Sequence, residues 1–276
     1  MCNQSSFPFI GSLGSSATFS FEVFHQYGKL PMENFHRKKS FNIIECKKKK
    51  PLSTILPTSP KPTTQKLGSG MLLWKNYISL SDQVEIVNIC QEFGAGPLGF
   101  YKPSHRNGAK LRFRLMCFGR EWDPVREYCQ YGHTTTPLIP DYFCSLVKTS
   151  IQDSQVYLNS KHEIPMISPD VCIVKFYTKT GQRAFHQDRG EGNRSRGWPV
   201  VSISIGDSAQ FIYGHTKNVH KADKVLLESG DVLIFGGMLR HIYHGVKRII
   251  PNSAPLPLLE HTMLKRGRLN LSLTKF

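Results

Sequence analysis

The sequence predicts an α+β fold in which two helices precede an antiparallel β unit, either a jelly-roll or a barrel covered by helices on one side. Helical periodicity of the apolar residues is confined to the region before Pro169. Short alternating or β-branched runs separated by glycines follow it. With 276 residues, 39% of them hydrophobic, the chain is long enough to bury a sizeable core.

Residues 1–67 are predicted to form a disordered, basic N-terminal extension, which leaves residues 68–276 for the folded domain. Ser-rich and Pro-rich stretches surround a lysine run at 47–50, and the segment holds ten Lys or Arg against three Glu. The lysine run is consistent with a nuclear localisation signal, with an arm that contacts phosphates, or with a solvated tail. We expect location in the nucleus and cytoplasm. The Ser-rich, acid-free first twenty residues leave the chloroplast as the alternative.

Two helices are expected. The first spans residues 80–93, where Ser79 and Asp82 form a capping box, Gly94 ends the helix, and one stripe carries Val84, Val87 and Cys90. The second starts near Pro140, a residue suited to a first turn, and turns inward Phe143, Leu146, Val147 and Ile151.

Strands are expected wherever β-branched or alternating runs occur after Pro169. They lie at residues 171–177, 200–205, 209–213, 231–235 and 269–273.

Charge and cysteine content narrow the class of protein. The formal net charge of +16 favours a polyanionic partner such as nucleic acid, although a solvated basic surface gives the same value. Seven cysteines without a C-x-x-C pair predict a reducing compartment rather than a disulfide framework. No apolar run is long enough to span a membrane, and we expect a monomer without membrane association.

A metal site is predicted at His186-Gln187-Asp188. On a strand, residues i and i+2 point to the same face, so His186 and Asp188 are able to bind one ion. His244, 56 residues beyond Asp188, supplies the third ligand. Two imidazoles and a carboxylate form the facial triad of non-haem Fe(II) oxygenases, which leaves positions open for a chelating cosubstrate and O2.

Other interpretations of these residues remain open. H-x-D occurs often by chance, and His241 is an alternative third ligand, although it lacks the Gly-Val that follows His244. Two His and one carboxylate also form catalytic zinc sites.

The C-terminal run predicts a pocket for an anionic cosubstrate. Alternation places Arg268, Asn270, Ser272 and Thr274 on one face of a strand. A buried guanidinium among hydroxyls and an amide requires an anion, and the distal carboxylate of 2-oxoglutarate provides one. The alternative is an arginine at an exposed strand edge.

With these motifs placed, residues 68–276 resemble the AlkB family of Fe(II)/2-oxoglutarate dioxygenases, most closely the plant proteins like AlkB homologue one. The resemblance rests on His186-x-Asp188, His244-Gly245 and Arg268-x-Asn270-x-Ser272 in that order. It implies a double-stranded β-helix (jelly-roll) core with N-terminal covering helices, and a nucleotide-gripping lid near residues 98–123. It also implies Fe(II) and, as cosubstrate, 2-oxoglutarate.

The chain departs from the family pattern at three places. Thr274 stands where the family has a second pocket arginine, and Lys175 replaces the Asn of an N-x-Y element whose tyrosine is kept as Tyr177. We therefore expect Tyr177 and Lys175 in the 2-oxoglutarate pocket, with Lys175 compensating for the missing arginine. The acid that the family often has two residues after the metal-binding Asp is Gly190, followed by Glu191.

The function implied by the resemblance is oxidative demethylation of N-methylated bases, with N6-methyladenine in DNA as the first substrate and tRNA bases as the second. A base must be flipped out or unpaired to reach a buried metal. Candidate nucleic-acid contacts are Tyr101, Lys102, Arg112, Arg114 and Glu191. No catalytic residue beyond the metal ligands is expected. The rival interpretation is a divergent, non-catalytic nucleic-acid-binding protein.

Overall fold

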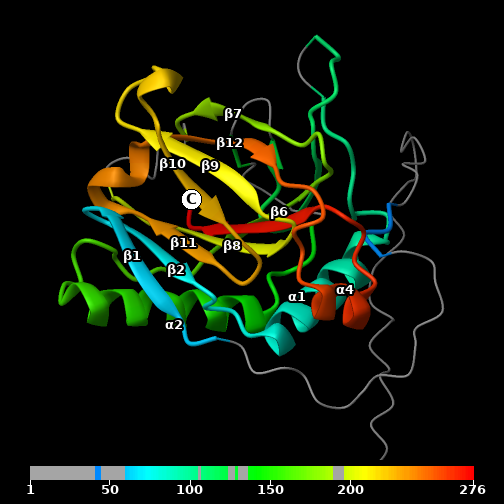
Figure 1. Cartoon of the computed structure of the whole chain (residues 1–276), viewed down its shortest axis with the longest axis horizontal. Coiled ribbons are helices and arrows are strands. Elements are labelled where there is room, and N and C mark those ends of the chain that lie inside the picture. The colour runs from blue at the N-terminus through cyan, green and yellow to red at the C-terminus, as the bar shows by residue number, and fades with distance from the viewer. Residues whose placement is uncertain (1–40, 45–59, 105–106, 124–127, 130–135, 189–195) are drawn as a thin grey trace, which may run out of the picture. The chain divides into compact units, whose positions relative to one another are not determined.

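The computed structural model describes residues 41–44, 60–104, 107–123, 128–129, 136–188 and 196–276. These residues form two main antiparallel sheets (Figure 1). The larger, seven-stranded sheet has the order β1-β2-β11-β8-β13-β6-β3, and the smaller, four-stranded sheet has the order β10-β9-β12-β7. We call them the major and the minor sheet.

The bounds of the elements follow the chain. The major sheet contains β1 (Thr63–Gly68), β2 (Met71–Lys75), β3 (Arg114–Gly119), β6 (Val171–Tyr177), β8 (Val200–Gly206), β11 (Val232–Phe235) and β13 (Arg268–Thr274). The minor sheet contains β7 (Arg183–His186), β9 (Ala209–Gly214), β10 (Asp223–Leu227) and β12 (Tyr243–Ile249). A small two-stranded ribbon joins β4 (Trp122–Asp123) and β5 (Tyr128–Cys129). The helices are α1 (Leu80–Gly94), α2 (Asp141–Leu158), α4 (Leu256–Thr262) and the 3-10 turns η1 (Val219–Lys221) and η2 (Gly237–His241).

Each face of the major sheet has its own core. On one face, α1, α2 and α4 bury their apolar sides against the sheet through residues such as Val87, Phe143 and Leu258 (Figure 1). The opposite face packs against the minor sheet through Tyr177 and Phe235, among others. Two antiparallel sheets with a core between them are the jelly-roll arrangement that the sequence predicts.

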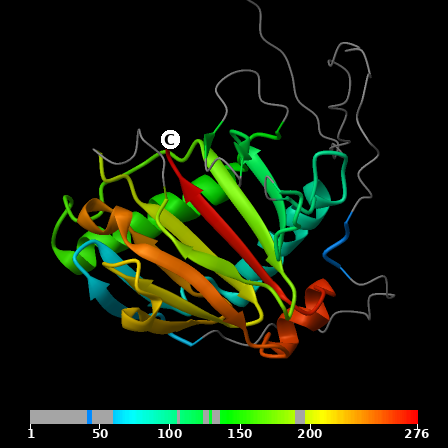
Figure 2. The same ribbon diagram turned by 90° about the horizontal axis from the view of Figure 1, so that it is seen from above.

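Strand β13 is an interior strand of the major sheet and lies between β6 and β8 (Figure 2). Its register places Arg268 opposite Tyr177, and Asn270 opposite Lys175. Alternate residues of these central strands therefore face the minor sheet, and this face carries the polar residues considered below.

The predicted helices and strands are confirmed within one residue, except that α2 starts at Asp141, just after Pro140. Ser79 Oγ accepts a hydrogen bond from Asp82 N, as the capping box predicts. The sequence did not predict β1, β2, β3, β4, β5, β10, β12 or α4. In β12 the alternation is broken by Gly245 and by two exposed cations, Lys247 and Arg248, so no strand pattern is visible there.

The structure also describes parts of two segments that the sequence assigned otherwise. β1 begins at Thr63, inside the predicted extension, and Ile43 is fully buried in the core beneath the major sheet. Residues 1–40 and 45–59 lie outside the described residues. The expected lid at 98–123 includes β3, which pairs with β6 as the edge of the major sheet. None of the described helices is both long and apolar enough to cross a membrane.

The burial of Ile43 predicts a large stability effect. Ile43→Ala removes buried methyl groups and leaves a cavity, so we expect the free energy of unfolding to fall by about 2–5 kcal/mol. Urea unfolding followed by circular dichroism measures it. Leu138→Ala, at a side chain 87% exposed, serves as control and should change little. Equal midpoints for both variants would show that Ile43 does not belong to the folded core.

Candidate active site

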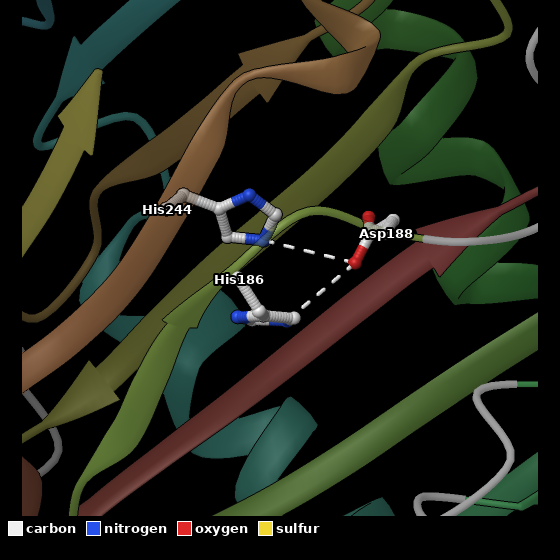
Figure 3. A group of neighbouring side chains, drawn as sticks. All are labelled: His186, Asp188 and His244. Carbon is white, nitrogen blue, oxygen red and sulfur yellow. Dashed lines mark ion pairs between the residues drawn. The ribbon is translucent and has the colours of Figure 1, made fainter. Parts of the chain in front are cut away.

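Two strands of the minor sheet bring two histidines face to face. β7 and β12 pair antiparallel, and their register places His244 opposite His186. The ring centroids are 4.7 Å apart. Asp188 follows two residues after the end of β7 and turns its carboxylate toward both rings (Figure 3).

The three side chains are spaced as metal ligands. Asp188 Oδ1 lies 3.7 Å from His186 Nε2 and 3.8 Å from His244 Nε2, and the three ligand atoms all lie within 4.8 Å of one another. Atoms bound to one ion at about 2.1 Å are roughly 3–4 Å apart. A metal therefore needs only small side-chain movements to bind here. Within the described ranges this is the one group of three or more metal-binding side chains.

Hydrogen bonds set the tautomers of both histidines. His186 Nδ1 lies 2.7 Å from the carbonyl oxygen of Ala184, and His244 Nδ1 lies 3.0 Å from that of Ile242. A carbonyl only accepts, so each Nδ1 carries the proton and each Nε2 presents its lone pair to the site. Burial lowers the pKa of His186 to about 3 and also lowers the pKa of His244. Both rings are therefore neutral at pH 7, as metal binding requires.

A buried arginine orients the carboxylate. Arg240, 2% exposed, donates from Nη1 to Asp188 Oδ2 at 2.7 Å, which leaves Oδ1 facing the histidines. Burial opposes ionisation of Asp188, but the charge of Arg240 and the two histidines outweigh it and hold the pKa of Asp188 below its usual range. Arg240 was not predicted from the sequence, because it lies in the 3-10 turn η2, where no periodicity marks an inward side chain.

A second arginine touches the metal site. Arg183 Nε donates to His186 Nε2 at 3.2 Å, the nitrogen that faces the other two ligands. A metal bound by His186 must replace this hydrogen bond. Arg183 lines the adjoining cavity and was likewise not predicted.

The structure corrects two details of the sequence argument. β7 ends at His186, so Asp188 lies beyond the strand and the i, i+2 rule does not place it. Its position comes from the chain segment after β7 and from Arg240 instead. His241 is not part of the group of ligands, and its carbonyl oxygen accepts a hydrogen bond from Gln187 Nε2 at 2.6 Å.

A cavity of about 90 Å³ adjoins the three ligands, between the two sheets. Of the residues predicted for the 2-oxoglutarate pocket, its walls include Lys175, Tyr177, Asn270 and Ser272. Burial raises the pKa of Tyr177 to about 12, so its hydroxyl remains a hydrogen-bond donor at neutral pH.

Arg268 lies behind this wall rather than on it. Its side chain is 1% exposed and donates to Ser204 Oγ at 2.6 Å and to the Leu227 carbonyl at 3.3 Å. Its Nε has no hydrogen-bond partner, and no carboxylate of the described chain forms an ion pair with the guanidinium. Burial lowers its pKa to about 10, so it remains charged. A buried, unpaired cation fits the carboxylate of a small anionic cosubstrate.

The other polar residues of β13 bind neighbouring backbone. Asn270 Nδ2 donates to Ser202 Oγ at 2.9 Å and to the Ile203 carbonyl at 3.0 Å, and Ser272 Oγ donates to Asn270 Oδ1. Thr274 Oγ1 donates to the Pro199 carbonyl at 2.9 Å. These groups hold β13 to its neighbours, and Thr274 offers no cation to the cavity.

The predicted nucleic-acid contacts fall in different places. Lys102 and Arg112 are exposed, and Arg112 donates to Gln182 at 3.0 Å. Tyr101 packs partly buried against the core between the sheets. Arg114, in contrast, lies on the helix-covered face, 3.6 Å above the ring of Phe41. The prediction for Arg114 is not supported, because a one-residue step along β3 changes the face. Glu191 lies outside the described residues.

The metal ligands can be tested one by one. We expect His244→Ala to abolish tight binding of Mn(II) or Co(II), since two ligands remain, and His241→Ala to leave it within a few-fold. Isothermal titration of the metal-free protein measures both. Loss of binding in the His241 variant alone would reverse the assignment.

Comparisons with known proteins agree with this geometry. Residues 70–273 match the model of the 2OG-Fe(II) oxygenase superfamily. Two relatives from Arabidopsis thaliana are the DNA N(6)-methyladenine demethylase ALKBH1D, 46% identical over 75% of this chain and 49% of its own, and ALKBH1C, 41% identical over 96% and 58%. The chain thus spans about half the length of these curated relatives. The solved structure of OsALKBH1 is 43% identical and superposes with a TM-score of 0.72, covering 78% of this chain and 100% of that chain.

Proteins of this superfamily use Fe(II) and 2-oxoglutarate. The group of two histidines and one aspartate is suited to the metal ion, and the cation-lined cavity is suited to 2-oxoglutarate. The match to the family model, the shared fold and the similarity to AlkB homologues together show the family of this chain. It belongs to the 2OG-Fe(II) oxygenase superfamily and, within it, to the AlkB family.

Proposed function

We propose that this chain is an Fe(II)/2-oxoglutarate-dependent dioxygenase that oxidatively demethylates N-methylated bases, N6-methyladenine in DNA first and methylated tRNA bases second. The observation that carries the proposal is the His186, Asp188 and His244 group, which opens onto a cavity between the sheets. The substrate rests on the names of the Arabidopsis relatives, both DNA N(6)-methyladenine demethylases.

The chain's own residues have definite roles in this reaction. His186, Asp188 and His244 would hold the ion, and Arg240 keeps one carboxylate oxygen turned toward it. Fe(II) with 2-oxoglutarate supplies the oxidation of the methyl C–H bond by O2. Phe211, Phe235 and Trp122 line the cavity and limit water in it.

Nucleic acid would approach along residues 98–104 and 107–113. Phe113 of this segment contacts Tyr177, with ring centroids 5.5 Å apart, so the segment packs against the cavity wall. It carries Lys102 and Arg112 as exposed cations for phosphates and Tyr101 as an aromatic group for stacking. A target base must leave the stack before its methyl group reaches the ion.

A non-catalytic nucleic-acid-binding protein is the second candidate, because Thr274 replaces a pocket arginine of the family pattern. The complete set of neutral histidines and an ionised aspartate favours the enzyme, since a binding protein has no need of a metal-ready site.

We further propose action as a monomer in the nucleus and cytoplasm, with the chloroplast as alternative. The lysine run 47–50 that motivates the nuclear address lies outside the described residues. We also assign α1 and α2 as the covering helices of the jelly-roll, since their buried faces join the core beneath the major sheet.

Turnover tests the function directly. Iron-loaded protein should convert 2-oxoglutarate to succinate, faster with N6-methyladenine oligonucleotides than with unmethylated ones, and Asp188→Ala should abolish both rates. Mass spectrometry measures the succinate formed and the loss of the methyl group from the oligonucleotide. No turnover at full iron occupancy would leave the non-catalytic candidate, while turnover indifferent to nucleic acid would remove the demethylase assignment.

The two faces of the major sheet predict different effects of arginine removal. Arg112→Gln should weaken oligonucleotide binding and reduce its dependence on salt by about one phosphate contact. Arg114→Gln, which loses its contact with Phe41, should lower thermal stability and leave binding within twofold. Fluorescence anisotropy at several salt concentrations measures binding. Equal losses in both variants would contradict the placement of Arg114.

A further inference from the structure

Lys175 is a half-buried cation on the wall of the cavity between the sheets. It lies in β6, opposite Asn270 of β13 and Leu115 of β3, and its side chain forms part of the cavity wall. Burial and the charge of Arg183 lower its pKa to about 8. Most of the amine population is therefore still protonated at pH 7.

No carboxylate of the described residues forms an ion pair with this ammonium group, and the charge of Asp188 acts on it only from a greater distance. Lys175 Nζ lies 5.6 Å from the centroid of the Trp122 ring, and Arg183 Cζ lies 5.8 Å from the same centroid. Two other cations do have carboxylate partners: Arg240 contacts Asp188 at 2.7 Å, and Lys75 contacts Asp231 at 2.5 Å. A buried cation without an anion is costly. The position of Lys175 thus calls for an anionic ligand in the cavity.

The neighbouring side chains on the same wall do not fill this role. Asn270 already uses its amide hydrogens on Ser202 and Ile203, and Thr274 uses its hydroxyl on Pro199. Ser272 donates to Asn270. Lys175 keeps all three of its ammonium hydrogens available for a ligand among the described groups.

Lys175 and Arg268 lie differently with respect to the proposed metal ligands. This difference determines which end of a bound dicarboxylate faces the metal. Lys175 lines the cavity together with Asp188, a proposed metal ligand, whereas Arg268 is not part of that lining and pairs with Tyr177. Lys175 is therefore the cation on the metal side. The cross-strand pair Lys175–Asn270 and the cross-strand pair Tyr177–Arg268 are two residues apart along β6, which corresponds to about 6.6 Å. Four C–C bonds of about 1.5 Å each, the backbone of 2-oxoglutarate, span a comparable length.

We propose that Lys175 Nζ pairs with the carboxylate at the 2-oxo end of 2-oxoglutarate and supplies the positive charge that Thr274 lacks. The distal carboxylate then lies toward Tyr177 and Arg268. This inference rests on the proposed dioxygenase function. The proposal assigns a specific role to Lys175, which stands where the N-x-Y element of the family has an asparagine.

The test is binding rather than turnover. The full chain is loaded with Mn(II) without oxygen, and isothermal titration measures affinity for 2-oxoglutarate and for 2-oxovalerate, which keeps the 2-oxo acid but has no distal carboxylate. Lys175→Gln should weaken both ligands by at least about tenfold, the size of one charged hydrogen bond. Lys175→Arg should recover part of the loss.

The matched control is Lys179→Gln, which removes the same charge from an exposed position just after β6 and should bind both ligands like the wild type. Lys175→Met keeps the aliphatic stem and replaces the Gln variant if that variant fails to fold. Thermal melting and Mn(II) affinity report on folding and on the metal site.

Three results would overturn the proposal. If wild type and Lys175→Gln bind 2-oxoglutarate equally, Lys175 is not a ligand contact, while the proposed function stands. If only 2-oxoglutarate is weakened and 2-oxovalerate is not, Lys175 holds the distal carboxylate instead. If the wild type binds Mn(II) but no 2-oxoglutarate, both this inference and the dioxygenase function fall together.

Discussion

The pairing of β7 with β12 is the constraint on which the site depends. In an antiparallel pair a slip of one residue turns every side chain to the other face, so the register that places His244 opposite His186 also decides whether a metal site exists. β12 is fixed on its other edge by β9, where His244 lies opposite Tyr213. Phe235 of the major sheet packs 5.0 Å from the His244 ring. The two sheets thus hold one histidine from several directions, as a preorganised ligand requires.

Charge balance links the metal to the cosubstrate. The cavity wall carries the carboxylate of Asp188, which is already paired with Arg240, and the ammonium group of Lys175, for which the described residues provide no ion pair. A divalent ion adds further positive charge to this enclosed space, which is unfavourable unless an anion enters as well. A dicarboxylate supplies two negative charges. Binding of the ion and of 2-oxoglutarate should therefore be mutually strengthening, and this coupling is reciprocal by thermodynamic necessity.

The sequence predicts those parts of the molecule whose pattern is local. The β-branched run of β6 and the alternation in β13 identified both strands, and the capping box at Ser79 identified α1. The three residues that the structure brings together as candidate metal ligands were also predicted, because H-x-D and a distal H-G are short motifs with a chemical reason. Arg240, by contrast, reaches Asp188 from a 3-10 turn, a contact set by tertiary structure alone. Ile43 illustrates the same limit, since no sustained apolar period surrounds it in the Ser-, Pro- and Lys-rich first 67 residues.

A lysine at position 175 can replace the charge of an arginine at position 274 because β6 and β13 are paired neighbouring strands. Thr274 pairs with Val171, and Lys175 with Asn270, so the two positions are two rows of side chains apart, roughly 13 Å along the sheet. A long cationic side chain from either row reaches the row of Ser272 between them. The chemistry of the two cations still differs: guanidinium binds a carboxylate with two parallel hydrogen bonds, whereas ammonium is a flexible point charge. A site built on Lys175 should therefore hold the 2-oxo acid with less geometric selectivity, and accept variation at that end of the cosubstrate that a second arginine would exclude.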